Sequence, residues 1–240
     1  MTESTSPVLE LRRVTFRGDG ESAIGFADFS ARVHGGDLVR VHLGRHQDAR
    51  DAVSTLLGLA TPTTGSIRFG GSDWLGHRYD SHFKMRSRIG RVFSRAAWIL
   101  NLTVGDNVRL PLMHHGLKLK EARAEIQQWT NRLCRSHARA IRDCMRKRPA
   151  FVEPSMLQVC QLIRAVCGSK QLLLLERPFR LLGQAFQTQF VDAVEQLRSE
   201  GVAVIWFADD RDESNGSFAS VTRTWSVKGD CLAGDQESKP

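Results

Sequence analysis

The sequence lacks any apolar run near the roughly 18 residues that a membrane-spanning helix needs. Its longest apolar segments, Leu172–Leu175 and Val202–Ala208, have the length of buried strands. The first seven residues are polar and contain no signal-peptide core. The 240 residues also contain no internal repeat and no low-complexity linker. These absences argue against a membrane-spanning or secreted protein and favour one α/β domain.

Cysteine is scarce and shows no metal-binding pattern. The five cysteines are odd in number and include no CxxC pair. This usage predicts reduced thiols in a cytosolic protein and argues against zinc. We expect no metal site from histidine either, because His42 and His46 are more typical of solvated side chains and the pair at 114–115 is isolated.

The net charge of +8 raises the question of an anionic partner. If residues 119–142 form a continuous helix, five arginines spaced by three and four residues would make one basic stripe, namely Arg132, Arg135, Arg139, Arg142 and Arg146. A solvated helix face is one interpretation. Contact with anionic lipid or an acidic partner is the other. No aromatic residues interleave with the stripe to stack on bases, so nucleic acid is disfavoured.

Several phrases resemble the framework of ATP-binding-cassette (ABC) ATPases and occur in that family's order. They are DLVRVHLG (37–44), LLGLATPTTG (56–65), RIGRVF (88–93), LTVGDNVRLPL (102–112), LLLLERP (172–178) and GVAVIW (201–206). The resemblance covers residues 8–230, and around residues 101–115 it is greatest to importer-like and phospholipid-trafficking systems. It implies an α/β P-loop NTPase fold of the ABC-ATPase type, with a parallel-sheet core, an N-terminal antiparallel β subdomain and a helical subdomain at about 95–166.

The same resemblance implies a domain plan and a set of partners. Residues 1–6 would be a flexible N-terminus, 7–232 a single ABC domain and 233–240 a polar tail. The implied cofactors are ATP and magnesium, and the implied partners are a membrane permease and a second ABC subunit, identical or different. The implied location is cytoplasmic, peripheral to the inner face of the cell membrane. In this family the permease's coupling helix lies near the position of Trp98, Ile99 and Leu100, for which core packing is the alternative interpretation.

The family's phosphate loop, GxxxxGK[ST], aligns with GRHQDARD at 44–51, which begins at Gly44. Ala49 replaces the second glycine and adds a Cβ where the backbone approaches phosphate. Arg50 keeps the positive charge of the lysine in a bulkier group, and Asp51 replaces the hydroxyl that binds magnesium. A carboxylate about 4 Å from a phosphate costs on the order of 4 kcal/mol at an effective dielectric near 20. These residues predict impaired ATP binding.

The positions that carry catalysis in the family are also altered. Its Walker B strand ends in two acids, where this sequence has Glu176 and Arg177. A guanidinium stays protonated and cannot take a proton or orient water through a lone pair. Ser94 stands in place of the glutamine that links magnesium to the permease, and Asp209 in place of the switch histidine. We therefore expect no catalytic residue.

The family's signature LSGGQ grips the nucleotide of the opposite subunit in a head-to-tail dimer. It aligns here with a segment of five residues, Val152, Glu153, Pro154, Ser155 and Met156. Glu153 would bring negative charge to a phosphate, and Pro154 removes a backbone donor. Paired with an active subunit, the chain would therefore impair both composite sites.

Two predictions for the side chain of Arg177 follow from its position. One is that it pairs with Asp51 and closes the former nucleotide site, and the other is that it lies at a surface or interface beside another acid. A structure that separates Arg177 from Asp51 would exclude the first.

Three functional hypotheses are consistent with the sequence. The leading one is a degenerate ABC subunit that acts as a structural or regulatory partner of a permease with impaired or absent ATP hydrolysis. The second is an active ABC ATPase with rearranged site residues, for which magnesium-dependent turnover would be the signature. The third is a soluble basic module for nucleic acid or anionic lipid, which would bind in a steeply salt-dependent way.

Overall fold

The computed structural model describes residues 6–76, 79–95, 97–134, 137–215, 218 and 220–237. Within these ranges ten strands form one mixed sheet in the order β5-β4-β1-β2-β10-β9-β3-β8-β7-β6. The strands are β1 (Leu9–Phe16), β2 (Gly25–Val33), β3 (Leu38–His42), β4 (Thr64–Phe69), β5 (Ser72–Asp73), β6 (Ile89–Val92), β7 (Leu172–Glu176), β8 (Ala203–Ala208), β9 (Arg223–Lys228) and β10 (Cys231–Glu237).

Strands β3, β8, β7 and β6 run parallel and form the central part of the sheet. Every residue of β7 and β8 is buried, because both faces of these strands are covered. Successive side chains of β7 point to opposite faces: Leu173 and Leu175 join the core beneath the helices, while Leu172 and Leu174 join the core shared with α1 and β1. This arrangement explains why the leucine run is continuous rather than alternating.

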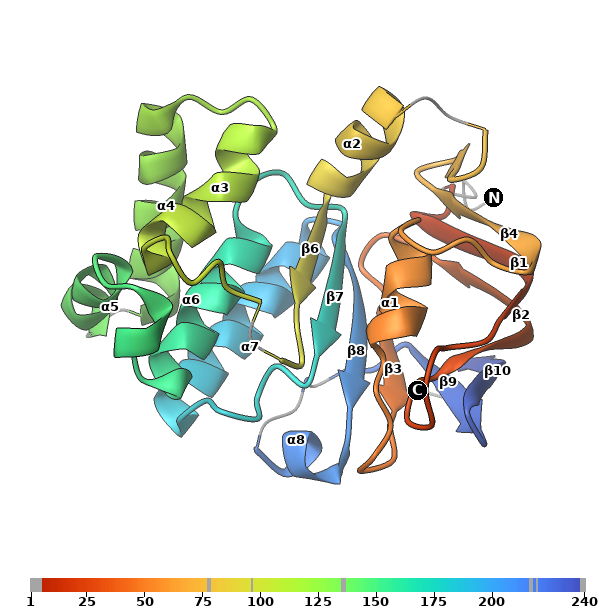
Figure 1. The fold of residues 1–240 in the computed structure, drawn as a ribbon. Helices are drawn as coiled ribbons and strands as arrows, with labels where there is room; N and C mark the ends of the chain where they lie inside the picture. Colours follow the sequence, from red (N-terminus) through yellow and green to blue (C-terminus); the bar gives the residue numbers. More distant parts are fainter. Residues whose placement is uncertain are drawn as a thin grey trace.

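The helices gather mainly on one side of the central strands, with α3 to α7 beside β6–β8 and α1 between the central strands and β1 (Figure 1). They are α1 (Arg50–Leu56), α2 (Tyr79–Ser87), α3 (Val104–His114), α4 (Leu119–Cys134), α5 (Ala138–Met145), α6 (Pro154–Val166), α7 (Gln184–Ser199) and α8 (Asp210–Asn215), with a 3-10 turn at Pro149–Phe151. In the described part of the chain, no helix combines the length and apolarity that a membrane crossing requires.

The single basic stripe predicted for residues 132–146 is wrong, because the helix that would carry it is not continuous. α4 ends at Cys134 and a separate helix, α5, begins at Ala138. Arg135 lies outside the described residues. Arg132 belongs to α4, where its guanidinium lies 4.7 Å from the centre of the Trp129 ring. Arg142 belongs to α5 and its side chain is exposed.

The polar tail predicted from residue 233 is wrong up to residue 237. These residues belong to β10, which pairs antiparallel with β9 and begins parallel to β2. The register sets Leu232 opposite Val227, and Leu232 is buried in the same core as Trp225. Residues 1–5 and 238–240 lie outside the described ranges, and the division of the chain into subdomains stays a prediction. The five cysteines, all of them described, are unpaired.

Candidate functional site

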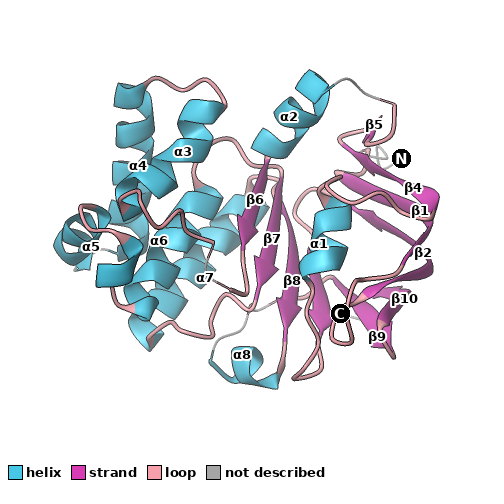
Figure 2. Cartoon of the chain, viewed as in Figure 1, coloured by secondary structure: helices cyan, strands magenta, loops and turns pink. Residues whose placement is uncertain are grey.

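The carboxyl ends of β3, β7 and β8 meet at one edge of the sheet, and Figure 2 shows the arrowheads of β7 and β8 pointing the same way. The parallel register sets His42 of β3 beside Ala208 of β8, and Glu176 of β7 beside Phe207. The loop 43–49, which we call the β3–α1 loop, leaves this edge and leads into α1. In open α/β sheets ligands bind outside the carboxyl ends of the strands, which makes this edge the candidate site.

The side chain of Arg177 occupies the edge from within. Its Nε donates to Oδ2 of Asp209 at 2.8 Å, and its Nη2 donates to the carbonyl oxygens of Gln47 at 2.8 Å and Gly44 at 3.4 Å. The side chain is only 5% exposed. Its backbone has φ +46, an unusual conformation for a residue with a Cβ, and its N–H is held by the carbonyl oxygen of Phe207 at 2.8 Å.

The predicted ion pair between Arg177 and Asp51 is wrong. Among the described residues Arg177 pairs with Asp209, while Oδ2 of Asp51 accepts the backbone N–H of Asp19 at 2.7 Å. The alternative interpretation of Arg177 as a surface residue fails as well, because the guanidinium is buried. One part of that interpretation is confirmed, because the partner of Arg177 is an acid, Asp209.

Asp209 is the centre of this charged group. Its Oδ2 also accepts from the Arg180 guanidinium at 2.8 Å, and its Oδ1 accepts the backbone N–H of Asp212 at 3.0 Å. Burial acts to raise the pKa of the Asp209 carboxyl, but the Asp212 N–H and the Arg177 guanidinium together bring that pKa below its usual value. Asp209 is therefore a carboxylate, and its charge is balanced by Arg177.

The backbone N–H groups of the β3–α1 loop are largely engaged inside the protein. The N–H of Gly44 donates to Oε1 of Gln47 at 2.8 Å, and the N–H of Gln47 donates back to the Gly44 carbonyl at 3.0 Å. Asp48 donates its N–H to the Ser22 carbonyl at 2.6 Å, and Arg50 donates its N–H to Oδ1 of Asp48 at 2.9 Å. A phosphate cradle needs such N–H groups free to point at the anion, and here four of them already have acceptors.

Gln47 and Ala49 hold the loop further, whereas Arg45 and His46 are exposed. Ala49 is buried and joins the core beside α1, so its Cβ packs inward. The Arg50 guanidinium lies on the exposed side, 3.7 Å from the Asp48 carboxylate. The side chain of Gln47 donates to the carbonyl oxygen of Gly229 and so links the loop to the turn before β10. The loop is therefore closed around its own side chains.

Glu176 is buried beneath the same edge and is engaged by an arginine of the neighbouring strand. Nε of Arg91 in β6 lies 2.7 Å from Oε1 of Glu176, and the Arg91 guanidinium lies 4.3 Å from the centre of the Phe93 ring. Burial raises the pKa of the Glu176 carboxyl, against the opposing effect of Arg91. Ser94 lines the adjoining recess of about 190 Å³. Across the described ranges no group of three His, Cys, Asp or Glu side chains is placed to hold a metal ion.

Replacing Arg91 with leucine is expected to lower the free energy of unfolding by about 1–3 kcal/mol, because Glu176 loses a buried charged partner. The loss stays moderate since the pKa of Glu176 is already raised and the carboxyl can take up a proton. Urea unfolding at neutral pH measures the change. The matched control is Arg95→Leu, an exposed arginine of the same recess, which should change stability by less than about 0.5 kcal/mol. Equal losses in the two variants would contradict the role given to the buried pair.

The segment 152–156 lies apart from this charged group, at the start of α6. Pro154 is the first residue of the helix, a position that tolerates its missing N–H. Glu153, Pro154 and Ser155 are exposed, and Val152 and Met156 are half-buried. The structure thus brings together Gly44, Arg177 and Asp209, with Glu176 beneath them, and does not join the segment 152–156 to them.

The turn at residues 98–100 presents apolar side chains to solvent. Ile99 is 45% exposed and Leu100 is 69% exposed. Trp98 is half-buried, with the Arg164 guanidinium 4.7 Å from the centre of its ring. Asn107 holds the turn, since it accepts the Ile99 N–H at 2.7 Å and donates to the Ile99 carbonyl at 3.0 Å. Core packing therefore does not account for Ile99 and Leu100.

Sequence reasoning missed three residues of the site. Arg91 could have been found. It is the one charged residue of the apolar strand β6 and needs a partner, and the buried strand β7 ends in a glutamate. Asp212 and Gln47 gave no such signal. Their roles depend on a helix turn after β8 and on the conformation of the β3–α1 loop, neither of which shows a periodic pattern.

The sheet order, the loop at its edge and the helical part define the class: the chain has the α/β P-loop NTPase fold of ABC ATPases. The solved dimer of MJ0796, a bacterial ABC transporter cassette, superposes with a TM-score of 0.78 at 18% identity and covers 97% of this chain and 99% of its own. The same cassette in a post-hydrolysis dimer bound to ADP and Pi gives 0.76 at 18% identity over the same fractions. An ATP-binding subunit of an ABC transporter gives 0.76 at 15% identity, covering 96% of this chain and 90% of its own.

Among curated proteins the chain is similar to the macrolide export ATP-binding/permease protein MacB. The identity is 22% over 237 residues for MacB of Mannheimia succiniciproducens, covering 97% of this chain and 35% of that protein. It is 25% over 202 residues for MacB of Salmonella typhimurium, covering 82% of this chain and 30% of that protein. The chain thus spans only a third or so of these relatives. No family model matches it.

Proposed function

We propose that the chain is an ATP-binding-cassette subunit of a membrane ABC transporter. This subunit does not hydrolyse ATP and acts as a structural or regulatory partner of a permease. The ABC-ATPase fold and the similarity to about a third of the ATP-binding/permease protein MacB support the class. The observation that carries the loss of hydrolysis is the buried guanidinium of Arg177, which is bonded to the carbonyl oxygens of Gly44 and Gln47 and to Asp209.

ATP and magnesium do not fit this edge as it is built. The N–H groups of Gly44, Gln47, Asp48 and Arg50 have internal acceptors. The carboxylate at position 51 adds negative charge next to the place where phosphate would lie. Glu176, which would support a metal ion, is paired with Arg91 below the surface. We therefore derive no hydrolytic step for this chain.

A role within an assembly accounts for a framework kept without this chemistry. The exposed side chains of Ile99 and Leu100 suit contact with a permease, together with Trp98. A second cassette subunit, identical or different, completes the proposed assembly at the cytoplasmic face of the membrane. The relatives are named as macrolide export proteins, whereas the sequence around 101–115 resembles importer-like and phospholipid-trafficking systems, so this assembly is compatible with transport in either direction.

Calorimetric titration with ATP, with and without magnesium, tests the proposal on the purified chain. We expect no binding at millimolar ATP, because the loop donors and the space are taken by the protein. The double variant Arg177→Ala/Asp209→Ala should gain weak binding, since it frees the volume of the guanidinium and leaves no uncompensated carboxylate beside the loop. Arg180→Ala is the matched control and should not gain it, because Arg180 contacts Asp209 but not the loop. Micromolar, magnesium-dependent binding by the unmodified chain would overturn the proposal and favour an active ATPase with rearranged residues.

A further inference from the structure

A groove of about 640 Å³ lies where α3, α4 and α5 pack on one another, on the side of the molecule away from β1 and β2 (Figure 1). Four arginines from these three helices surround it, and two apolar side chains form part of its wall; the six are Arg109, Arg123, Arg142, Arg146, Ile126 and Met145. We call it the arginine groove. It lies far along the chain from the β3–α1 loop and shares no lining residue with the recess beside Glu176.

The groove carries excess positive charge. Its described lining residues include no aspartate or glutamate. Arg109 pairs with Asp106, one turn earlier on α3, and Arg146 lies 3.9 Å from Asp143 with its side chain 83% exposed. Arg123 and Arg142 are exposed and form no ion pair with any described residue. Two guanidinium groups therefore face the same groove without a counter-charge from the protein.

The packing of the helices, rather than the arginines, holds the groove together. The N–H of Val104 donates to the carbonyl oxygen of Lys147 at 2.8 Å. Gly105 lies so close to the end of α5 that a Cβ on it would be 2.9 Å from the carbonyl oxygen of Met145. This contact brings the first turn of α3 against the last turn of α5. Because like charges destabilise a compact state, the gathered arginines do not serve the fold.

We propose that the arginine groove binds an organic phosphate. A guanidinium presents a planar fork of N–H donors that matches phosphate oxygens, and those of Arg123 and Arg142 form no ion pair with a carboxylate of the described residues. The buried side chain of Ile126 and the half-buried Met145 offer apolar contact to the organic part of the ligand. The volume lies within the roughly 300–1,000 Å³ of small-molecule sites. A phospholipid headgroup and a soluble phosphate ester share this chemistry, and the site does not depend on the function proposed for the sheet edge.

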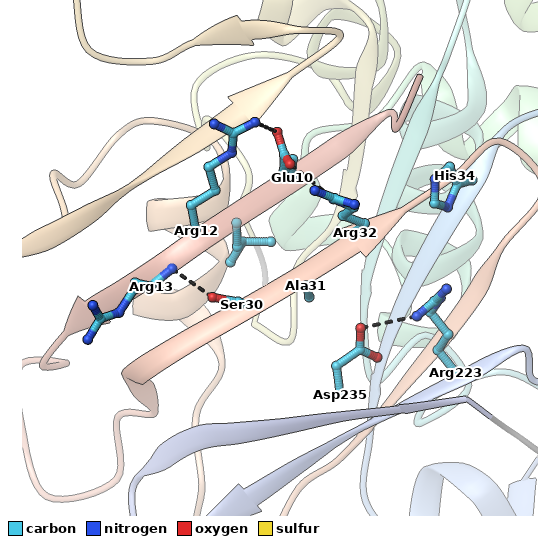
Figure 3. A pocket seen from close by; sticks show the side chains of 10 residues that line it. Glu10, Arg12, Arg13, Ser30, Ala31, Arg32, His34, Arg223 and Asp235 are labelled. Atoms are coloured by element: carbon cyan, nitrogen blue, oxygen red, sulfur yellow. Dashed lines mark hydrogen bonds and ion pairs between the residues drawn. The ribbon is translucent and has the colours of Figure 1, made fainter. Parts of the chain in front are cut away.

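A second arginine-rich hollow shows what a structural charge network looks like in the same chain. It has a volume of about 610 Å³ on the β1–β2 face (Figure 3). There Arg12 and Arg32 both form ion pairs with the buried Glu10 carboxylate, at 2.9 and 3.0 Å. Arg223 forms an ion pair with Asp235 at 3.2 Å. Its arginines have protein carboxylates as partners, so this hollow gives no reason to expect an anion.

The test measures binding of two probes to the full chain. Glycerol 3-phosphate is titrated by NMR, and vesicles of phosphatidylcholine, with and without phosphatidylglycerol, are titrated by sedimentation. The double variant Arg123→Gln/Arg142→Gln removes the two unpaired guanidinium groups and should raise Kd about tenfold for each arginine. The matched control, Arg139→Gln/Arg148→Gln, removes the same charge from two exposed arginines outside the groove and should leave Kd unchanged. Thermal unfolding verifies that both variants fold.

The two probes identify the source of the phosphate. Binding of glycerol 3-phosphate that the groove variant weakens supports the proposal with a soluble ligand. Binding of phosphatidylglycerol vesicles alone, weakened in the same way, supports it with a lipid headgroup. The proposal is overturned if neither probe binds, if the control variant loses as much affinity as the groove variant, or if poly-glutamate binds where both phosphate probes fail, since that would indicate an acidic protein partner.

Discussion

Replacing Arg177 with alanine is expected to lower the free energy of unfolding by about 3–5 kcal/mol, the cost of leaving one member of a buried ion pair without its partner. Burial then acts to raise the pKa of Asp209 without Arg177 to oppose it, while the Asp212 N–H and the Arg180 guanidinium still favour the carboxylate, so proton uptake relieves the cost mainly at low pH. Arg180 offers only partial compensation, because its side chain is 41% exposed and its charge is screened by solvent. The variant also releases the carbonyl oxygens of Gly44 and Gln47. Urea unfolding at neutral pH measures the loss.

A double-mutant cycle separates the ion pair from the packing around it. The double variant Arg177→Ala/Asp209→Ala should be more stable than Arg177→Ala, because the second change removes the uncompensated carboxylate. Arg180→Ala is the control for loss of a guanidinium on the same carboxylate and should cost less than about 1 kcal/mol. A double variant that is less stable than the unmodified protein by the full sum of the two single effects would show that the two side chains act independently.

The stability of the protein relative to an Asp212→Asn variant is expected to fall as the pH rises from about 4 to about 7. Burial raises the pKa of the Asp212 carboxyl from its usual value of 3.8 to about 7, although the Trp206 indole N–H and the Phe179 N–H act against the rise. Between those values the folded state binds more protons than the unfolded state, so stability is lost with rising pH. Three pKa units correspond to about 4 kcal/mol, which is the upper limit of the change.

Urea unfolding of both proteins over this pH range checks the sign, because the difference between them cancels the titration of other groups. Asp209 titrates in the opposite sense, since its lowered pKa gives stability that is lost as the pH falls. The matched control is Asp192→Asn, which makes the same substitution at an exposed position of α7. The Asp212 carboxyl accepts the Phe179 N–H at 2.7 Å and the Trp206 indole N–H at 2.9 Å. If the unmodified protein instead gains stability over Asp212→Asn as the pH rises, these two donors outweigh burial in setting the pKa of Asp212.

Much of the fold could be predicted because its signals are local. The leucines of β7 and the apolar run of β8 are as long as buried strands, and both form parallel strands at the centre of the sheet. The ABC-ATPase fold predicted from the order of the sequence phrases is confirmed by the solved cassettes. Two local predictions failed for want of tertiary information: residues 119–142 contain a break between α4 and α5, and residues 233–237 extend the sheet as part of β10.

The candidate site was predictable in position but not in its contacts. The alignment of residues 44–51 with a phosphate loop placed it at the end of β3, and the acid at 176 placed the end of β7 at the same edge of the sheet. The partner of Arg177 was not predictable from distance along the chain. Asp51 and Asp209 are both acids near the same edge, and only the register of β7 against β8 decides between them.

The residues alone were enough to predict the main strands and helices in their order along the chain and the buried centre of the sheet. They also show an arginine where ABC ATPases have an acid. These properties depend on hydrophobic periodicity and residue identity, which a linear chain displays directly. The tertiary structure alone decided that Arg177 bonds Asp209 and the carbonyl oxygens of the β3–α1 loop, and that arginines from α3, α4 and α5 surround one groove. Both depend on where helices and loops stop and turn, because a side chain's partners are set by packing between segments far apart in the chain.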